Sequence, residues 1–111
     1  MDWKKIHSIL FVPAEKKRLD KIKDLTADAY IIDLEDAIKD SEKDLARKEV
    51  RLFLDEAKDR NILLRINPME LEKETEMFGD SMSVNCIVIP KVESVEILQT
   101  VRAAFPGRDT S

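Results

Sequence analysis

Short apolar runs alternate along this chain with stretches in which apolar residues recur at helical spacing. The predicted strands are residues 6–12, 29–34, 61–66 and 86–89. The predicted helices are residues 15–25, 41–58, 69–78 and 95–105. Short runs rich in β-branched residues are typical of strands buried on both faces of a parallel sheet. Because strictly alternating strands and helices form right-handed parallel βαβ units, the sequence predicts an α/β fold with four strand–helix units.

Two architectures fit this alternation, an open doubly wound sheet and part of a (β/α)8 barrel. A glycine-rich turn after the first strand would favour the open sheet, but the chain has only Gly79 and Gly107. The 111 residues are enough for one domain with a hydrophobic core, and no linker or low-complexity segment divides them. We therefore expect one domain over residues 1–111.

The composition is that of a soluble globular protein, with 43 % apolar and 38 % charged residues. The longest uncharged apolar runs are as short as a strand, so we expect no membrane span. The N-terminus lacks the apolar core of a signal peptide, and the single cysteine, Cys86, cannot form an intrachain disulfide. These features predict a cytoplasmic protein in which Cys86 is a small buried hydrophobic residue.

The net charge of −4 is unevenly distributed. Residues 1–23 contain seven Lys or Arg and three Asp or Glu, so the rest of the chain is strongly acidic. An acidic body argues against nucleic acid as the main partner, whereas the basic opening is compatible with a small anionic ligand. The acids at residues 70, 72, 74 and 76 are interpreted as a solvated helix face, and residues 108–111 as a loose tail.

The carboxyl end of each predicted strand carries polar or turn residues that packing alone does not require. They are Pro13 and Glu15 after the first strand, Glu35 and Asp36 after the second, Arg65 and Asn67 at the third, and Lys91 and Glu93 after the fourth. Loops at this edge of a parallel sheet or barrel form active sites. We therefore expect these side chains to surround one site.

The second strand ends in a cluster of three carboxylates, Asp33, Glu35 and Asp36. Like charges that lose water raise one another's pKa and cost stability, so a chain that keeps them at a buried strand end is expected to use them. The alternative is that Glu35 and Asp36 lie in a solvated loop.

Arg65 interrupts an apolar run, where a charge is costly unless it is paired or reserved for a ligand. A guanidinium can bind a ligand carboxylate through two parallel hydrogen bonds, and we favour this interpretation. The alternative is an ion pair with Glu35 or Asp36, and both can hold in different states. Lys91 follows the apolar residues 88–90, which is compatible with a Schiff-base nucleophile, although a plain electrostatic or solvent-facing role is favoured.

Four segments together resemble the citrate lyase β-subunit-like branch of the HpcH/HpaI aldolase family. They read Ser-Ile-Leu-Phe-Val-Pro at residues 8–13, Asp-Leu-Glu-Asp-Ala-Ile at 33–38, Leu-Arg-Ile-Asn-Pro at 64–68 and Ile-Pro-Lys-Val-Glu-Ser at 89–94. Each stands at the carboxyl end of a predicted strand, and they occur in the family's order. One segment alone would be weak evidence, whereas the set is fairly specific and spans residues 7–94.

The resemblance implies a TIM barrel and a Mg²⁺-dependent carbon–carbon lyase that acts on acyl-CoA thioesters such as citryl-CoA or malyl-CoA. It implies that Arg65, with Pro13 and Lys91, binds the oxo-acid part of the substrate. Glu35 and Asp36 are implied as catalytic carboxylates that hydrogen-bond the waters of the metal. Lys16 and Arg18 follow the turn where family members contact the phosphates of CoA, although a solvated helix face explains them almost as well.

The chain departs from the family pattern in three ways. His7 stands where the family usually has Arg, and Ala14 where it usually has Gly, which puts the ligand contacts of the first loop in doubt. A full barrel takes ~250 residues, so this chain supplies only half of one, a partial TIM-barrel domain. The acidic residues that bind Mg²⁺ directly in the family come from later strands, so none of its direct metal ligands is expected here.

Three hypotheses follow. The first is the N-terminal half of a citrate-lyase-β-like enzyme, inactive alone. The second is a non-catalytic half-barrel that self-associates through its exposed sheet edges and binds a carboxylate or CoA, so a homo-oligomer is expected. The third is an open flavodoxin-like sheet unrelated to lyases.

Overall fold

The computed structural model describes residues 3–35, 38–56, 60–81, 83–89, 95–107 and 109–110. The strands are β1 (Ile9–Pro13), β2 (Ala29–Asp33), β3 (Ile62–Arg65), β4 (Val84–Val88) and β5 (Asp109–Thr110). The α-helices are α1 (Lys16–Lys21), α2 (Lys43–Glu56), α3 (Leu71–Phe78) and α4 (Val95–Ala104). Short 3-10 turns are η1 (Trp3–Lys5), η2 (Ile22–Asp24), η3 (Asp40–Glu42) and η4 (Pro68–Glu70).

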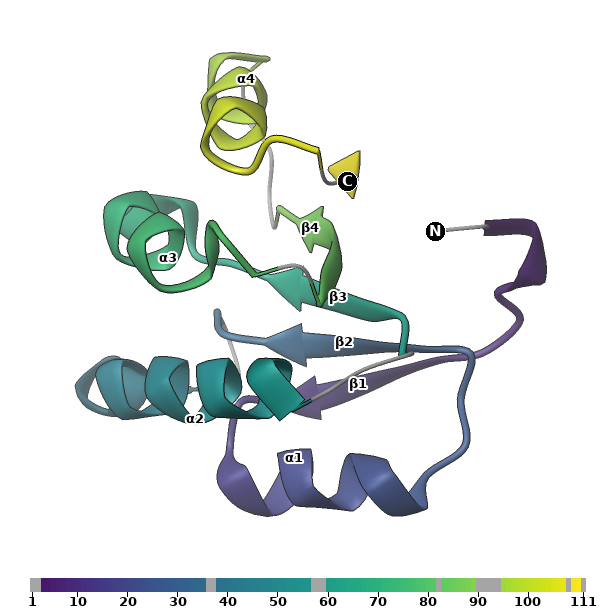
Figure 1. The fold of residues 1–111 in the computed structure, drawn as a ribbon. Coiled ribbons are helices and arrows are strands. Elements are labelled where there is room, and N and C mark those ends of the chain that lie inside the picture. Colours follow the sequence, from purple (N-terminus) through teal and green to yellow (C-terminus); the bar gives the residue numbers. More distant parts are fainter. Residues whose placement is uncertain are drawn as a thin grey trace.

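The strands form one parallel sheet in the order β1-β2-β3-β4-β5. A doubly wound sheet reverses its strand order at a switch point, whereas a barrel adds each strand beside the preceding one. Figure 1 shows the sheet curving from β1 to β4, with the helices around its outer side. The structure therefore confirms an α/β fold consistent with half of a TIM-type barrel, and argues against the open flavodoxin-like alternative.

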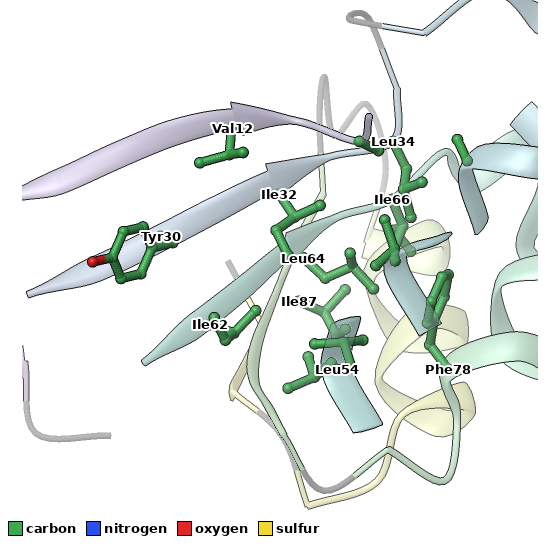
Figure 2. Close-up of a cluster of buried hydrophobic side chains, with 14 of the residues drawn as sticks. Val12, Tyr30, Ile32, Leu34, Leu54, Ile62, Leu64, Ile66, Phe78 and Ile87 are labelled. Atoms are coloured by element: carbon green, nitrogen blue, oxygen red, sulfur yellow. The ribbon is translucent and has the colours of Figure 1, made fainter. Parts of the chain in front are cut away.

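The main hydrophobic core lies between the sheet and the helices. Alternate strand residues, among them Ile32, Leu64 and Ile87, are fully buried there against Leu54 of α2 and Phe78 of α3. Figure 2 shows these side chains meeting on the helix-facing side of the strands. The period of two along each strand explains why these residues share one face.

The opposite, inner face of the sheet carries a smaller apolar cluster of Ala29, Ile31, Leu63 and Cys86. Cys86 is fully buried there, as predicted from the sequence. Two residues of β1 continue this face, because Ile9 pairs with Ala29 and Phe11 with Ile31. Their exposed fractions are 43 % for Ile9 and 64 % for Phe11, so this part of the inner face is open.

Two predictions at the ends of the sheet are wrong: the start of the first strand and the loose tail. β1 begins at Ile9 rather than residue 6, because the backbone N–H groups of His7 and Ser8 donate to the Asp28 carboxylate instead of a strand. The predicted loose tail contains β5, whose Asp109 and Thr110 pair with Cys86 and Ile87.

β4 also begins earlier than predicted, at Val84. The register between β3 and β4 shifts after Ile62, and Asn85 is the extra residue. The side-chain oxygen of Asn85 accepts the N–H of Ile62 at 3.0 Å, so a side chain supplies the acceptor at this bulge.

The predicted solvated acidic face of residues 70–76 is wrong at Glu74. This side chain of α3 is fully buried and forms an ion pair with Arg47 of α2. Buried charges are paired in proteins because the desolvation of an unpaired charge costs roughly several kcal/mol. The partner lies 27 residues away in the sequence, on another helix.

Candidate functional site

The carboxyl ends of β2 and β3 bring one basic and two acidic side chains together. Asp33 and Arg65 are register partners in the last positions of the two strands. They follow Ile31 and Leu63 with a period of two, so they lie on the inner face of the sheet. Glu35 follows β2 by two residues and reaches the same guanidinium. We call Asp33, Glu35 and Arg65 the rim cluster.

The rim cluster is a connected ion-pair network. Nη1 of Arg65 donates to Oδ2 of Asp33 at 3.3 Å, and Nη2 of Arg65 lies 3.0 Å from Oε2 of Glu35. The other oxygen of Asp33, Oδ1, accepts the backbone N–H of Glu35 at 2.8 Å. Asp33 thus orients both the loop that carries Glu35 and the arginine opposite.

The rim cluster is partly sheltered from water, with side chains 10 % exposed for Asp33, 16 % for Glu35 and 21 % for Arg65. One guanidinium faces two carboxylates, so the three groups together carry a charge of −1. A guanidinium has five N–H donors and can bind a further carboxylate, or exchange one carboxylate for another. Partial burial strengthens such charge-assisted contacts relative to those in water.

The structure brings together only some of the predicted site residues. Arg65 and Glu35 are in direct contact, and Pro13 ends β1 as the register partner of Asp33, at the same edge of the sheet. The other predicted catalytic carboxylate, Asp36, and the predicted substrate-binding Lys91 lie outside the described residues.

The predicted CoA contacts, Lys16 and Arg18, are exposed residues of α1. A surface pocket of about 390 Å³ lies where α1 begins beside α2, and Lys16 lines it, whereas Arg18 does not. The charged residues of its lining are Lys16, Lys17, Glu15, Glu42 and Glu49. Three carboxylates and two ammonium groups give this pocket no excess of positive charge for a phosphate.

Asp33 was predicted only as one of three strand-end carboxylates, and no separate role was assigned to it. Its identity as the last residue of a buried strand was the available signal, because a carboxylate there needs a partner. That the partner is Arg65 depends on the register between β2 and β3, which follows from pairing in three dimensions.

The rim cluster does not fit a Mg²⁺ site by itself. Both of its carboxylates contact Arg65, and no group of three or more His, Cys, Asp or Glu side chains placed to bind a metal occurs among the described residues. Mg²⁺ prefers six oxygen ligands in near-octahedral geometry. A Mg²⁺ ion at this edge would need ligands in addition to Asp33 and Glu35. Among the helices of the described ranges, none combines the length and apolarity needed to span a membrane.

Comparisons with known proteins agree with the family resemblance described above. A family model described as HpcH/HpaI aldolase/citrate lyase matches residues 7–110. A (3S)-malyl-CoA thioesterase of Cereibacter sphaeroides strain KD131 is 37 % identical over 105 residues, covering 89 % of this chain and 36 % of that protein. The protein of the same name from strain ATCC 17025 is 39 % identical with the same coverage. This chain thus spans about a third of the length of the curated relatives that it matches. It belongs to the HpcH/HpaI aldolase/citrate lyase family.

Proposed function

We propose that this chain supplies the carboxylate-binding part of an active site of the acyl-CoA lyase or thioesterase type. Arg65 binds a carboxylate of an oxo acid, or of an acyl-CoA thioester formed from one, such as malyl-CoA. The rim cluster is the observation that carries this proposal, because it presents a half-buried guanidinium at the edge where barrel enzymes bind substrate. Family membership and the name of the relatives support the same substrate class.

In this proposal each rim residue has a separate task. Arg65 orients the substrate through two parallel hydrogen bonds, with Pro13 and Lys91 as further substrate contacts. Asp33 orients Arg65. Glu35, and with it Asp36, acts as a carboxylate beside the reacting end of the substrate. Lys16 and Arg18 contact the CoA phosphates as separate exposed cations of α1, and not through the pocket that Lys16 lines.

The rim charge sets a condition on ligand binding. An anionic substrate meets a net charge of −1 at the rim cluster, so it must displace Glu35 from Arg65 or bring additional positive charge with it. We propose that a bound Mg²⁺ would supply this charge and would polarise the substrate carbonyl, and that residues other than the rim cluster would hold it. We further propose that the 111-residue chain, a single partial barrel domain of the cytoplasm, has no lyase or thioesterase activity alone.

Thermal unfolding tests the proposal with oxaloacetate as the probe, with and without Mg²⁺. At a concentration about 100 times its dissociation constant, a ligand stabilises the folded protein by about 2.7 kcal/mol. We expect oxaloacetate to raise the midpoint of the wild-type protein and to have no effect on Arg65→Ala.

Arg60→Ala is the matched control. Arg60 is also partly buried, but it bonds the carbonyl of Ile22 and the hydroxyl of Tyr30 at the amino ends of the strands. This variant should keep the full response to oxaloacetate. An unchanged midpoint of the wild-type protein, or equal responses of both variants, would contradict the proposal.

The open inner face favours a second candidate, a non-catalytic half-barrel that self-associates. Phe11 and Ile9 are exposed beside a buried apolar cluster on the same face, and uncovered strands and apolar surface promote association. Light scattering tests it with Phe11→Lys, which should convert an oligomer into a monomer. Leu52→Lys, at an exposed leucine of α2, is the control. A monodisperse wild-type monomer would contradict this candidate.

A further inference from the structure

A charged cluster lies buried between α2 and α3, apart from the rim cluster. Arg47 of α2 is only 2 % exposed and donates to three carboxylates. Its Nε bonds Glu74 at 3.1 Å, its Nη2 bonds Glu70 at 2.9 Å and its Nη1 bonds Asp44 at 2.9 Å. Glu74 is fully buried. All three guanidinium nitrogens are thus used within the protein.

The same carboxylates bind the loop that follows β3. The second oxygen of Glu74, Oε1, accepts the backbone N–H of Asn67 at 3.3 Å. The side chain of Asn67 donates to Oε1 of Glu70 at 3.4 Å and accepts the N–H of Met69 at 3.0 Å. Glu70 and Glu74 therefore each bridge Arg47 to Asn67, which stands two residues after Arg65.

The residue between Arg65 and Asn67 is fixed as well. Ile66 is fully buried in the main core, and its N–H donates to the carbonyl of Val88 at 3.2 Å. The backbone from Arg65 to Asn67 is consequently held by β4 on one side and by the α2–α3 cluster on the other. A shift of Asn67 would move the end of β3, on which the guanidinium of Arg65 depends for its place.

Stability alone does not account for this cluster. Replacing a buried ion pair with well-packed apolar residues is often neutral or stabilising, because the desolvation of two charges offsets their attraction. What apolar residues cannot reproduce is the acceptor for the N–H of Asn67. The effect specific to these charges is therefore to fix the position of the Asn67 backbone.

We propose that Arg47 and Glu74 are positioning residues for Arg65. They fix the path of the backbone after β3 and so the placement of the Arg65 guanidinium opposite Asp33 and Glu35. This inference rests on the proposed function for its effect on substrate, since a displaced Arg65 binds a carboxylate less well.

The test uses nuclear magnetic resonance of the Arg65 Nε–H group and hydrogen exchange of the Asn67 amide. In the double variant Arg47→Met and Glu74→Leu, we expect the Asn67 amide to exchange about tenfold faster or more. The chemical shift of the Arg65 Nε–H group should move toward the value seen for arginines that form no ion pair. Oxaloacetate should bind about tenfold more weakly or worse.

The matched control is the double variant Arg51→Met and Asp80→Asn. It removes an ion pair of 2.6 Å between α2 and the segment that follows α3, and neither residue of this pair contacts Asn67. It should leave the Arg65 signal and oxaloacetate binding unchanged. Equal effects of the two double variants on Arg65 would overturn the proposal.

Glu74→Gln decides the case if the apolar double variant does not fold. Its amide oxygen can accept from Asn67 but cannot also pair ionically with Arg47, so we expect a smaller shift of the Arg65 signal in the same direction. An unchanged Arg65 signal in folded Glu74→Gln, or loss of folding in both variants, would overturn the proposal. If the wild-type protein binds no oxaloacetate, the proposed function fails, whereas the Arg65 signal still decides the positioning role.

Discussion

Asp33 and Arg65 are register partners at the carboxyl ends of β2 and β3, and a hydrogen bond of 3.3 Å joins Oδ2 of Asp33 to Nη1 of Arg65. Asp33 also accepts the N–H of Glu35, so one buried carboxylate fixes both a strand-end cation and the loop beside it. The pair is part of the fold and of the candidate site at once, which makes its structural and ligand-binding contributions separable only by experiment.

Removal of the arginine should destabilise the protein even without ligand. In Arg65→Ala the carboxylate of Asp33, only 10 % exposed, loses its cation. A buried polar group left without its partner costs about 1–3 kcal/mol, and we expect a loss of this size in the free energy of unfolding. Urea denaturation measures it. Arg102→Ala, at an exposed position of α4, should change the free energy by less than about 0.5 kcal/mol. Equal values for the two variants would contradict the pairing.

Neutralising Glu35 should strengthen the binding of an anion. Glu35→Gln removes the carboxylate that competes for Arg65 and brings the rim cluster from −1 to neutral. Two like unit charges 4 Å apart repel each other by about 1 kcal/mol in water. Because the variant removes this repulsion, we expect oxaloacetate to bind about fivefold more tightly. Isothermal titration calorimetry measures the dissociation constant. Glu96→Gln makes the same charge change on α4, away from the rim, and should have no effect; weaker binding to Glu35→Gln would contradict the competition.

The helix-facing core should dominate the stability of the sheet. Leu64→Ala removes a fully buried side chain at the centre of the main core, and such truncations cost about 2–5 kcal/mol. Leu52→Ala, whose side chain is exposed on α2, should cost less than about 0.5 kcal/mol. Chemical denaturation of both variants checks this. Comparable losses would mean that α2 does not pack on the sheet as described.

Acid should weaken the contribution of Glu70 to the stability of the folded protein. The hydrogen bond from Arg47 lowers the pKa of Glu70 below its usual 4.5, and Lys73 and Lys43 act in the same direction. The folded protein therefore binds this proton less readily than the unfolded chain, and the stability that Glu70 contributes is present above pH 4.5 and lost as the pH falls. The wild-type protein should exceed Glu70→Gln in unfolding midpoint at pH 7, by a difference that shrinks in acid.

Glu74 should show the opposite dependence. Burial raises the pKa of Glu74 above 4.5, although Arg47 and the N–H of Asn67 oppose this shift. A raised pKa contributes stability that is present in acid and lost as the pH rises through the folded-state value. Relative to Glu74→Gln, the wild-type protein should thus lose stability between acid and neutral pH. The stability difference between the wild-type protein and Glu74→Gln should therefore change with pH in the opposite direction to the difference between the wild-type protein and Glu70→Gln. A change of both differences in the same direction would contradict this assignment.

The alternation of strands and helices and the meeting of Arg65 with Glu35 could be predicted from the sequence. Both follow from local pattern: buried strands read as apolar runs, and parallel strands bring their carboxyl ends to one edge. The alternative weighed for Arg65, an ion pair with Glu35 or Asp36, is met at Glu35; Asp33 is a second partner that was not predicted, and Asp36 lies outside the described residues. Whether a ligand replaces them stays a prediction.

The predictions that are wrong concern residues whose structure depends on contacts between distant segments. Glu74 lies among other acids of α3, and only the packing of α2 against α3 gives it Arg47 as a partner. The two residues of β5 have no strand pattern of their own and are ordered by pairing with β4. Helical periodicity and strand length carry no information on either contact.

A crystal structure of the protein with oxaloacetate tests the central claim most directly. We expect a carboxylate of the ligand within hydrogen-bond distance of the Arg65 guanidinium, with Glu35 displaced from Nη2 and Asp33 still bonded to Nη1. A ligand bound elsewhere, with Arg65 still paired to both Asp33 and Glu35, would contradict it.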